Sequence, residues 1–145
     1  MKFREIGLID ISAIFSIRLA TDENKFTYEE LVQHGISHES VRNKLLTTCK
    51  GWLCETNNME VGFIIADKSS GEIWLLAVLP QYINKKIGSQ LLNIAENWLI
   101  SEGHKRLWLI TDPDKNLRAY SFYLKNGWLE RKIENGILYM EKAID

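Results

Sequence analysis

The chain has 145 residues, of which 46% are hydrophobic and 26% charged, which is enough apolar material for one globular domain with its own core. Its formal net charge is −1 at pH 7, so it lacks the excess of basic residues that nucleic acid or an anionic membrane surface would attract. We therefore expect binding to neither.

The sequence predicts no signal peptide, no membrane span and no disulfide framework. Glu5 and Asp10 interrupt any N-terminal run that could serve as a signal peptide, and no stretch approaches the length of a membrane span. Cys49 and Cys54 are too few for a disulfide framework, and no histidine pair lies near them to make a zinc site. We expect a cytoplasmic protein with buried free thiols and no metal.

The first third of the chain predicts a strand followed by helices. Residues 2–6 are typical of a short strand, and residues 8–20 of a helix with an apolar face. The Thr-x-x-Glu sequence at 27–30 is a capping box that begins a second helix, and Gly35 ends it. A serine cap then predicts a third helix over residues 37–46.

Three strands are predicted next, at residues 51–56, 60–67 and 72–79. The turn sequences Asn57-Asn58 and Ser69-Ser70-Gly71 lie between them. Because both connections are short, the three strands are expected to form an antiparallel meander.

The second half of the chain predicts helix, strand, helix and hairpin. These elements are expected at residues 86–102, 105–111, from about 116, and at 128–133 with 137–142. Gly103 is a typical residue to follow the end of a helix, and Asn135-Gly136 is the strongest short signal for a hairpin turn.

The junction between the strand at 72–79 and the helix at 86–102 favours anion binding. The first N–H groups of a helix have no partners within it and carry about half a positive charge. A phosphate can therefore bind there through backbone groups alone. Lys85 and Lys86 add two charges at this point, although they could also be an ordinary solvated pair.

Two segments resemble a known family. The sequence from Ala77 to Leu92 is similar to the acetyl-CoA signature of the GNAT superfamily of N-acetyltransferases, with matches at Val78, Pro80, Gly88, Leu91 and Leu92. The sequence from Asn116 to Trp128 resembles a second GNAT element, with matches at Asn116, Ala119, Phe122, Tyr123, Lys125 and Gly127. The order of predicted elements also agrees with the family over nearly the whole chain.

The resemblance implies a single GNAT domain over residues 1–145. Its fold would be α/β (α+β), with a mixed, mostly antiparallel central sheet of six to seven strands flanked by four or five helices. Its activity would be the transfer of an acetyl group from acetyl-CoA to a primary amine by direct attack. The acceptor could be a small molecule or a peptide amine, and a homodimer is a further expectation.

The resemblance also implies roles for particular residues. The backbone of Leu76 and Val78 would bind the pantetheine arm, and Asn116 would be a further cofactor contact. Tyr123 would protonate the departing thiolate, unless it only packs in the core. The resemblance places the acceptor pocket near residues 18–30, whose acidic residues would suit a cationic amine unless they only cap helices or are solvated. Among them Glu23 would steer the ammonium or relay its proton. The pyrophosphate would be bound by the loop and helix start, at Ile83, Lys85, Lys86, Ile87, Gly88 and Ser89.

Two positions depart from the family signature. Ile83 stands where the signature has Arg or Gln, and Lys86 stands where it has its first Gly. Glycine at that position lets the loop approach the phosphates without a Cβ atom. The two departures could weaken acetyl-CoA binding. The alternative to an active enzyme is therefore a catalytically silent acyl-CoA-binding or sensor module of the same fold.

Overall fold

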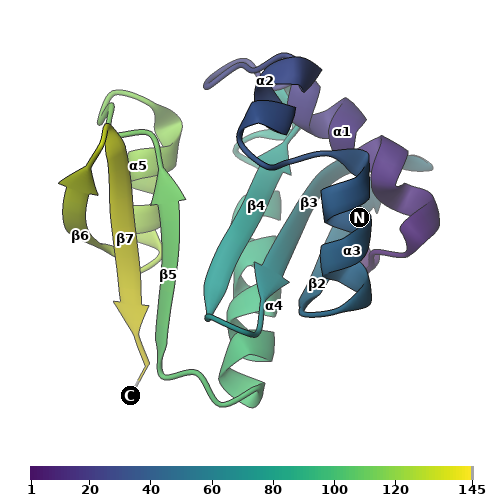
Figure 1. Ribbon diagram of the computed structural model, residues 1–145. Coiled ribbons are helices and arrows are strands. Elements are labelled where there is room, and N and C mark those ends of the chain that lie inside the picture. Colours follow the sequence, from purple (N-terminus) through teal and green to yellow (C-terminus); the bar gives the residue numbers. More distant parts are fainter. Residues whose placement is uncertain (145) are drawn as a thin grey trace.

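The computed structural model describes residues 1–144, and seven strands form one sheet within them (Figure 1). The strands are β1 (Lys2–Glu5), β2 (Cys49–Thr56), β3 (Met59–Asp67), β4 (Glu72–Val78), β5 (Arg106–Thr111), β6 (Leu129–Glu134) and β7 (Ile137–Ala143). Their order across the sheet is β1-β2-β3-β4-β5-β7-β6. Neighbouring strands are antiparallel except β4 and β5, which run parallel, so the predicted mixed sheet is confirmed.

Helices cover the two faces of this sheet unequally (Figure 1). The helices are α1 (Ile11–Leu19), α2 (Tyr28–Gln33), α3 (His38–Leu46), α4 (Ile87–Ser101) and α5 (Arg118–Lys125). Helices α1, α2 and α3 lie over β2, β3 and β4 on one face, and α4 and α5 lie on the other (Figure 1). The first face of β5, β7 and β6 therefore has no helix over it. Within residues 1–144, no helix has the length and apolar composition needed to cross a membrane.

Each layer of helices has its own apolar core. Ile14 of α1 and Leu31 of α2 pack with Phe63 of β3 on one face, whereas Leu91 of α4 and Tyr123 of α5 belong to the core on the other. This division follows from the alternation of side chains along the strands. Both faces of the central strands are buried, which explains the nearly continuous apolar runs in the sequence.

The local signals for turns and caps are confirmed. The side chains of Thr27 and Ser37 each accept a backbone N–H bond at the start of α2 and α3, as capping boxes require. Asn57 and Asn58 have φ angles of 53° and 62°, and Asn135 has a φ of 53° in the hairpin between β6 and β7. Asparagine adopts this left-handed region at lower cost than most residues, so the sequence located both turns correctly.

Helix α5 begins later than the sequence predicted. The backbone N–H of Asn116 donates to Oδ1 of Asp114 at 2.9 Å, which holds these residues in a turn. Leu117 then occupies the N-cap position, and the first helical residue is Arg118. Asn116 is therefore outside the helix, two residues before its first helical residue. A short 3-10 turn at Pro80–Tyr82 was also not predicted.

Strands β4 and β5 separate almost at once. They pair at a single position, Glu72 with Trp108, and no further pairing between them is found in residues 1–144. Behind the opening, Glu96 of α4 accepts hydrogen bonds from Nε1 of Trp128 and Nζ of Lys142, both at 2.8 Å. The two parts of the sheet are thus joined at the base and through α4, and they are open between the upper ends of β4 and β5.

Candidate active site

The edge of β4 that faces the opening has free backbone groups. The N–H of Leu79 donates to the carbonyl of Val61 at 2.8 Å, so this pair is hydrogen-bonded across β3 and β4. Bonded and non-bonded pairs alternate in an antiparallel ladder. The backbone groups of Leu76 and Val78, which pair with β3 at the non-bonded positions, therefore point away from β3 and toward the opening. An extended amide chain could pair with β4 at these two residues.

The N-terminus of α4 is open. Its N-cap, Lys86, has no side-chain cap and lies in the left-handed region, with φ 64° and ψ 14°. A left-handed residue followed by a right-handed one turns successive N–H groups toward a common point, which makes an anion-binding concavity. The groups at Ile87, Gly88 and Ser89 are the free N–H groups of the first helical turn. This arrangement suits a pyrophosphate.

Two lysines lie beside this helix start. Lys85 and Lys86 are both exposed, and neither takes part in a salt bridge within the described part of the chain. The N–H of Ile83, by contrast, is directed to the carbonyl of Pro80 at 3.4 Å in the 3-10 turn. A Cβ atom at position 88 would lie 3.2 Å from the ring of Phe122, so any larger residue than Gly88 would require the ring to shift slightly. Helices α4 and α5 therefore approach closely at the site.

Tyr123 is buried but its hydroxyl is free. Its ring packs edge-on against Phe122 and Trp128, with centroids 5.2 and 6.1 Å away. Burial raises the pKa of Tyr123 above its usual value, so the phenol is neutral at physiological pH. Among residues 1–144, no hydrogen bond holds this hydroxyl and no fully buried side-chain polar atom lacks a partner. The hydroxyl must therefore reach a surface that is open to solvent or ligand.

Glu72 is a candidate that the sequence analysis missed. It pairs with Trp108 at the base of the opening, so both side chains project from the same face of the sheet. The charge of Lys44 in α3 acts on Glu72, which places this face on the side of α1, α2 and α3. Burial raises the pKa of Glu72 to about 7, with the nearby charge of Asp67 adding to the rise and that of Lys44 opposing it. An acidic residue at the start of an otherwise apolar strand was the available signal.

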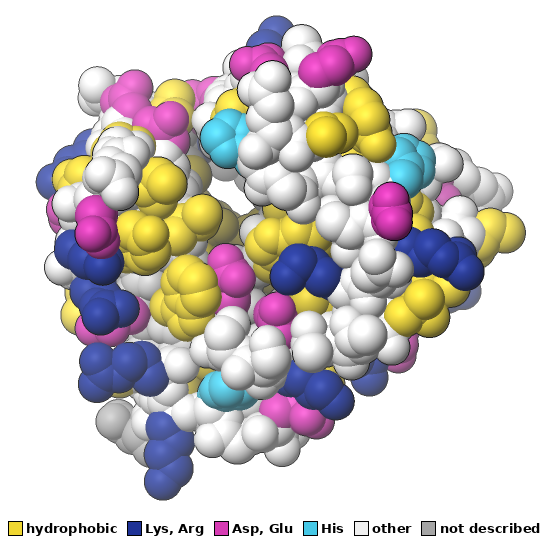
Figure 2. Space-filling model, in the orientation of Figure 1, with side chains coloured by type: hydrophobic (Ala, Val, Ile, Leu, Met, Phe, Trp, Pro, Cys, Tyr) yellow, Lys and Arg dark blue, Asp and Glu magenta, His cyan; other side chains and the backbone are white. Residues whose placement is uncertain are grey.

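The uncovered face next to Glu72 is aromatic and acidic. Trp108 of β5 stacks with Tyr139 of β7 at a centroid distance of 6.4 Å, and Glu141 is the cross-strand partner of Trp108. Two cations of the chain already bind here, because Nζ of Lys132 lies 4.8 Å from the Tyr139 ring centroid and Arg106 is 3.3 Å from Glu141. Figure 2 shows the hollow between the two halves, with acidic side chains inside it and hydrophobic ones on both sides. This surface is suited to a cationic ligand.

Glu23 lies at the other end of the opening and is not free. Its carboxylate accepts the backbone N–H of Arg118 at 2.9 Å, and its Oε1 is 3.6 Å from Nε of the same residue. Asp22 also pairs with the Arg118 guanidinium. The role predicted for Glu23, steering or relaying the proton of the ammonium, stays a prediction.

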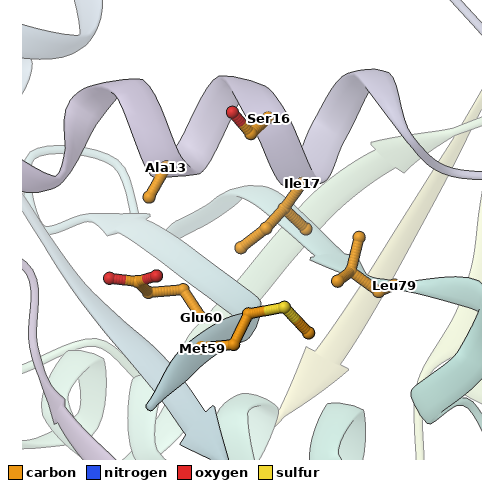
Figure 3. A pocket seen from close by; sticks show the side chains of 6 residues that line it. All are labelled: Ala13, Ser16, Ile17, Met59, Glu60 and Leu79. Atoms are coloured by element: carbon orange, nitrogen blue, oxygen red, sulfur yellow. The ribbon is translucent and has the colours of Figure 1, made fainter.

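A pocket of about 260 Å³ lies between α1 and the strands (Figure 3). Aliphatic side chains of α1 and Leu79 point into it, and Met59 and Glu60 form its other wall (Figure 3). The Glu60 carboxylate is 4.0 Å from Arg4. No group of three or more potential metal ligands is found in residues 1–144.

Known proteins resemble the chain over its full length. A spermidine N(1)-acetyltransferase of Thermoplasma acidophilum is 26% identical over 166 residues, covering 100% of this chain and 98% of the relative. The crystal structure of the PaiA N-acetyltransferase from Thermoplasma acidophilum, in complex with coenzyme A, superposes with a TM-score of 0.84 at 21% identity, covering 99% of each chain. The ribosomal-protein-S18-alanine N-acetyltransferase of Escherichia coli gives a TM-score of 0.77 at 17% identity, covering 99% of this chain and 94% of that one.

A sequence model of the acetyltransferase (GNAT) family matches residues 17–128, and the chain belongs to this family. It is accordingly an N-acetyltransferase, and its acetyl donor is acetyl-CoA, as the two sequence motifs predicted. The single match spans both motifs and runs from the last turn of α1 through α5.

Proposed function

We propose that the protein transfers an acetyl group to a primary amine by direct attack, in the opening between β4 and β5. The observation that carries this proposal is the separation of the two strands above Glu72, which leaves the backbone of Leu76 and Val78 unpaired. Acetyl-CoA would supply the acetyl group and a thiolate leaving group. Its pantetheine amides would pair with β4 as an additional strand does.

The donor's phosphates would bind at the start of α4. Free N–H groups at Ile87, Gly88 and Ser89 favour this assignment, as do the two exposed charges at Lys85 and Lys86. The Ile83 side chain leaves these N–H groups in place, so the departure from the family signature does not remove the anion site. Asn116 is exposed just before α5 and is retained as a further contact.

Glu72 is proposed as the base that takes the proton from the amine. An alkyl amine with a pKa of about 10.4 is almost fully protonated at pH 7, and exposing its lone pair costs about 4.6 kcal/mol. A carboxylate with a pKa of about 7 is a far better base at that pH than an ordinary glutamate. Glu72 is close enough to Lys44 of α3 to feel its charge, and α3 lies on the face opposite α4 (Figure 1). An acceptor and the donor phosphates would therefore approach from opposite faces of the sheet.

Tyr123 is proposed as the donor to the leaving sulfur. Its hydroxyl has no partner among the described residues, and burial keeps it protonated across the working pH range. The carbonyl oxygen gains charge during the attack, and the outward-facing N–H of Leu76 could stabilise it. These two groups act on different atoms of the thioester.

The acceptor is proposed to be a small polycationic amine. One relative is named for spermidine, and here the uncovered face offers Glu72 and Glu141 beside the stacked rings of Trp108 and Tyr139. Carboxylates and aromatic faces together attract ammonium groups.

We further propose that residues 1–145 act as one domain in the cytoplasm, where free thiols such as those of Cys49 and Cys54 persist. A homodimer remains a prediction that analytical ultracentrifugation can test.

The test is a thiol-release assay over a panel of polyamines, monoamines, aminoglycosides and peptides. Burial raises the pKa of Cys49 to about 12, so its thiol should not react with the detecting reagent in the native protein. Turnover of a polyamine well above the amine-free blank supports the proposal. A melting temperature that rises with acetyl-CoA while no amine is acetylated would favour the silent acyl-CoA-binding module. If acetyl-CoA neither binds nor stabilises, both functions are excluded.

A further inference from the structure

Helix α5 has its N-terminal cap supplied from a distant part of the chain. Its N-cap residue, Leu117, has no side-chain oxygen with which to accept a hydrogen bond. The carboxylate of Glu23 takes that place and accepts the N–H of Arg118, although the two residues are 95 positions apart. The first turn of α5 is therefore held by the loop between α1 and α2.

The Arg118 side chain strengthens the same connection. Its guanidinium pairs with Asp22, and its Nε lies 3.6 Å from Oε1 of Glu23. We call these three residues the brace. It joins a loop of one half of the molecule to a helix of the other half, at the end where β4 and β5 are open (Figure 1).

The loop that carries the brace has a defined structure of its own. Arg18 donates to Oγ1 of Thr21 and to the carbonyl of Asn24, both at 3.1 Å, and its guanidinium lies 5.1 Å from the ring centroid of Phe26. The loop therefore folds around one half-buried cation and presents Asp22 and Glu23 on its outside. A flexible loop could not fix the position of a helix in this way.

The position of α5 matters because Tyr123 lies five residues after Arg118. We infer that Glu23 is a positioning residue: through the brace it fixes the start of α5, and thereby the Tyr123 hydroxyl, relative to β4. This inference rests on the proposed acetyl transfer. It differs from a direct role of Glu23 with the amine, because it requires an acceptor oxygen at this position and not a charge.

Two substitutions separate these roles. Glu23→Gln keeps an oxygen that can accept the Arg118 N–H but removes the charge, whereas Glu23→Ala removes both. Glu39→Ala is the matched control, because Glu39 is an exposed carboxylate in the first turn of α3 and lies on another part of the surface. Each variant is examined by amide hydrogen exchange and by steady-state kinetics.

For Glu23→Ala we expect faster exchange in the first turn of α5 and a turnover number about ten- to a hundredfold lower, since small displacements of a reacting group have effects of this size. Glu23→Gln should restore the exchange protection and bring turnover to within about threefold of the native value. Glu39→Ala should change neither.

Two results would overturn the inference. Unchanged exchange in α5 of the Glu23→Ala variant would show that the brace does not hold the helix. A Glu23→Gln variant that keeps its protection but is as inactive as Glu23→Ala would show that the charge acts directly on the amine. Amide exchange is measured without substrate. It therefore tests the placement of α5 even if the protein does not catalyse the proposed acetyl transfer.

Discussion

Helices α4 and α5 both begin without a cap from their own neighbouring residues, and the structure treats the two ends differently. At α4 the N-cap is Lys86 in a left-handed conformation, and the first N–H groups are left free beside two exposed lysines. At α5 the N-cap is Leu117, and Glu23 fills the position that an anion would take. One end is available to a ligand and the other is used by the protein.

This difference shows that an uncapped helix start in a sequence is not yet a binding site. Whether the free N–H groups bind a ligand depends on what the rest of the chain brings to them. The comparison also separates two kinds of residue. Substitutions at the start of α4, such as those of Lys85 and Lys86, should alter acetyl-CoA binding. Substitutions of the proposed catalytic groups, Glu72 and Tyr123, should alter turnover.

The largest effect is expected for Glu72→Gln. Loss of a general base typically lowers turnover by about 10²- to 10⁴-fold. In the native enzyme, kcat/KM should rise with pH through about 7, as Glu72 loses its proton. The variant should lack this rise, which a pH profile measures. A full rate with an unchanged profile would exclude Glu72 as the base.

Glu72 also has a predictable effect on stability. Because the pKa in the fold is raised above the ordinary carboxyl value, its contribution is fully present below that ordinary value and is lost as the pH rises through about 7. The Gln variant should therefore gain stability relative to the native protein above neutral pH. Thermal unfolding at several pH values measures the difference.

Tyr123→Phe should lower turnover by roughly ten- to a thousandfold, in or below the general-acid range because a thiolate leaves fairly well unaided. The KM for acetyl-CoA and the melting temperature should hardly change, since the ring stays and the hydroxyl has no bond to lose within residues 1–144. Steady-state kinetics and calorimetry measure both. Unchanged turnover would mean that Tyr123 only packs. A loss of more than about 2 kcal/mol in unfolding free energy would identify a structural hydrogen bond instead.

Replacing both Lys85 and Lys86 with Ala should raise the KM for acetyl-CoA by about three- to tenfold, because exposed charges near a phosphate interact weakly through water. Turnover at saturation should stay the same, and the dependence of KM on salt should fall. Kinetics at two ionic strengths provide the measurement. A salt dependence equal to that of the native enzyme would place the phosphates elsewhere.

The smallest effect concerns the backbone at the α4 end. Lys86→Gly should raise the unfolding free energy by up to about 1 kcal/mol or leave it unchanged, because glycine adopts a φ of 64° without the steric cost that lysine bears. Donor affinity should be unchanged or higher. Lys85→Gly is the control: Lys85 is not among the positive-φ residues, so glycine there should only destabilise. A large loss of affinity in Lys86→Gly would show that the Lys86 side chain is a needed contact.

Much of the fold was predictable because its signals are local. Capping boxes, the Asn-Gly hairpin and the run from β4 into α4 each depend on a few adjacent residues, and the structure has all of them. The later start of α5 was missed for two reasons. Asp114 holds Asn116 in a turn outside the helix, and the true N-cap, Leu117, has no side-chain oxygen to mark the helix start in the sequence. Local patterns thus fix element types better than their ends.

The site was predictable only in part. Motifs pointed to the α4 junction and to Tyr123, and their roles stay predictions. The free edge of β4 depends on where β5 lies, and the role proposed for Glu72 depends on burial beside Asp67 and Lys44, which no window of sequence contains. The contact of Glu23 with Arg118 joins residues 95 positions apart, so only the folded chain reveals it.

The free backbone of Leu76 and Val78 has a consequence for solubility. Groups that can pair with a pantetheine amide can equally pair with an extended peptide, and unpaired strand edges are common templates for aggregation. In this molecule the edge lies inside the sheet, so only a chain that entered the opening could reach it. A bound donor would close that entry. We therefore expect aggregation, measured by light scattering, to begin at a lower temperature without acetyl-CoA than with it. In a cell short of acetyl-CoA, less of the enzyme would stay in solution.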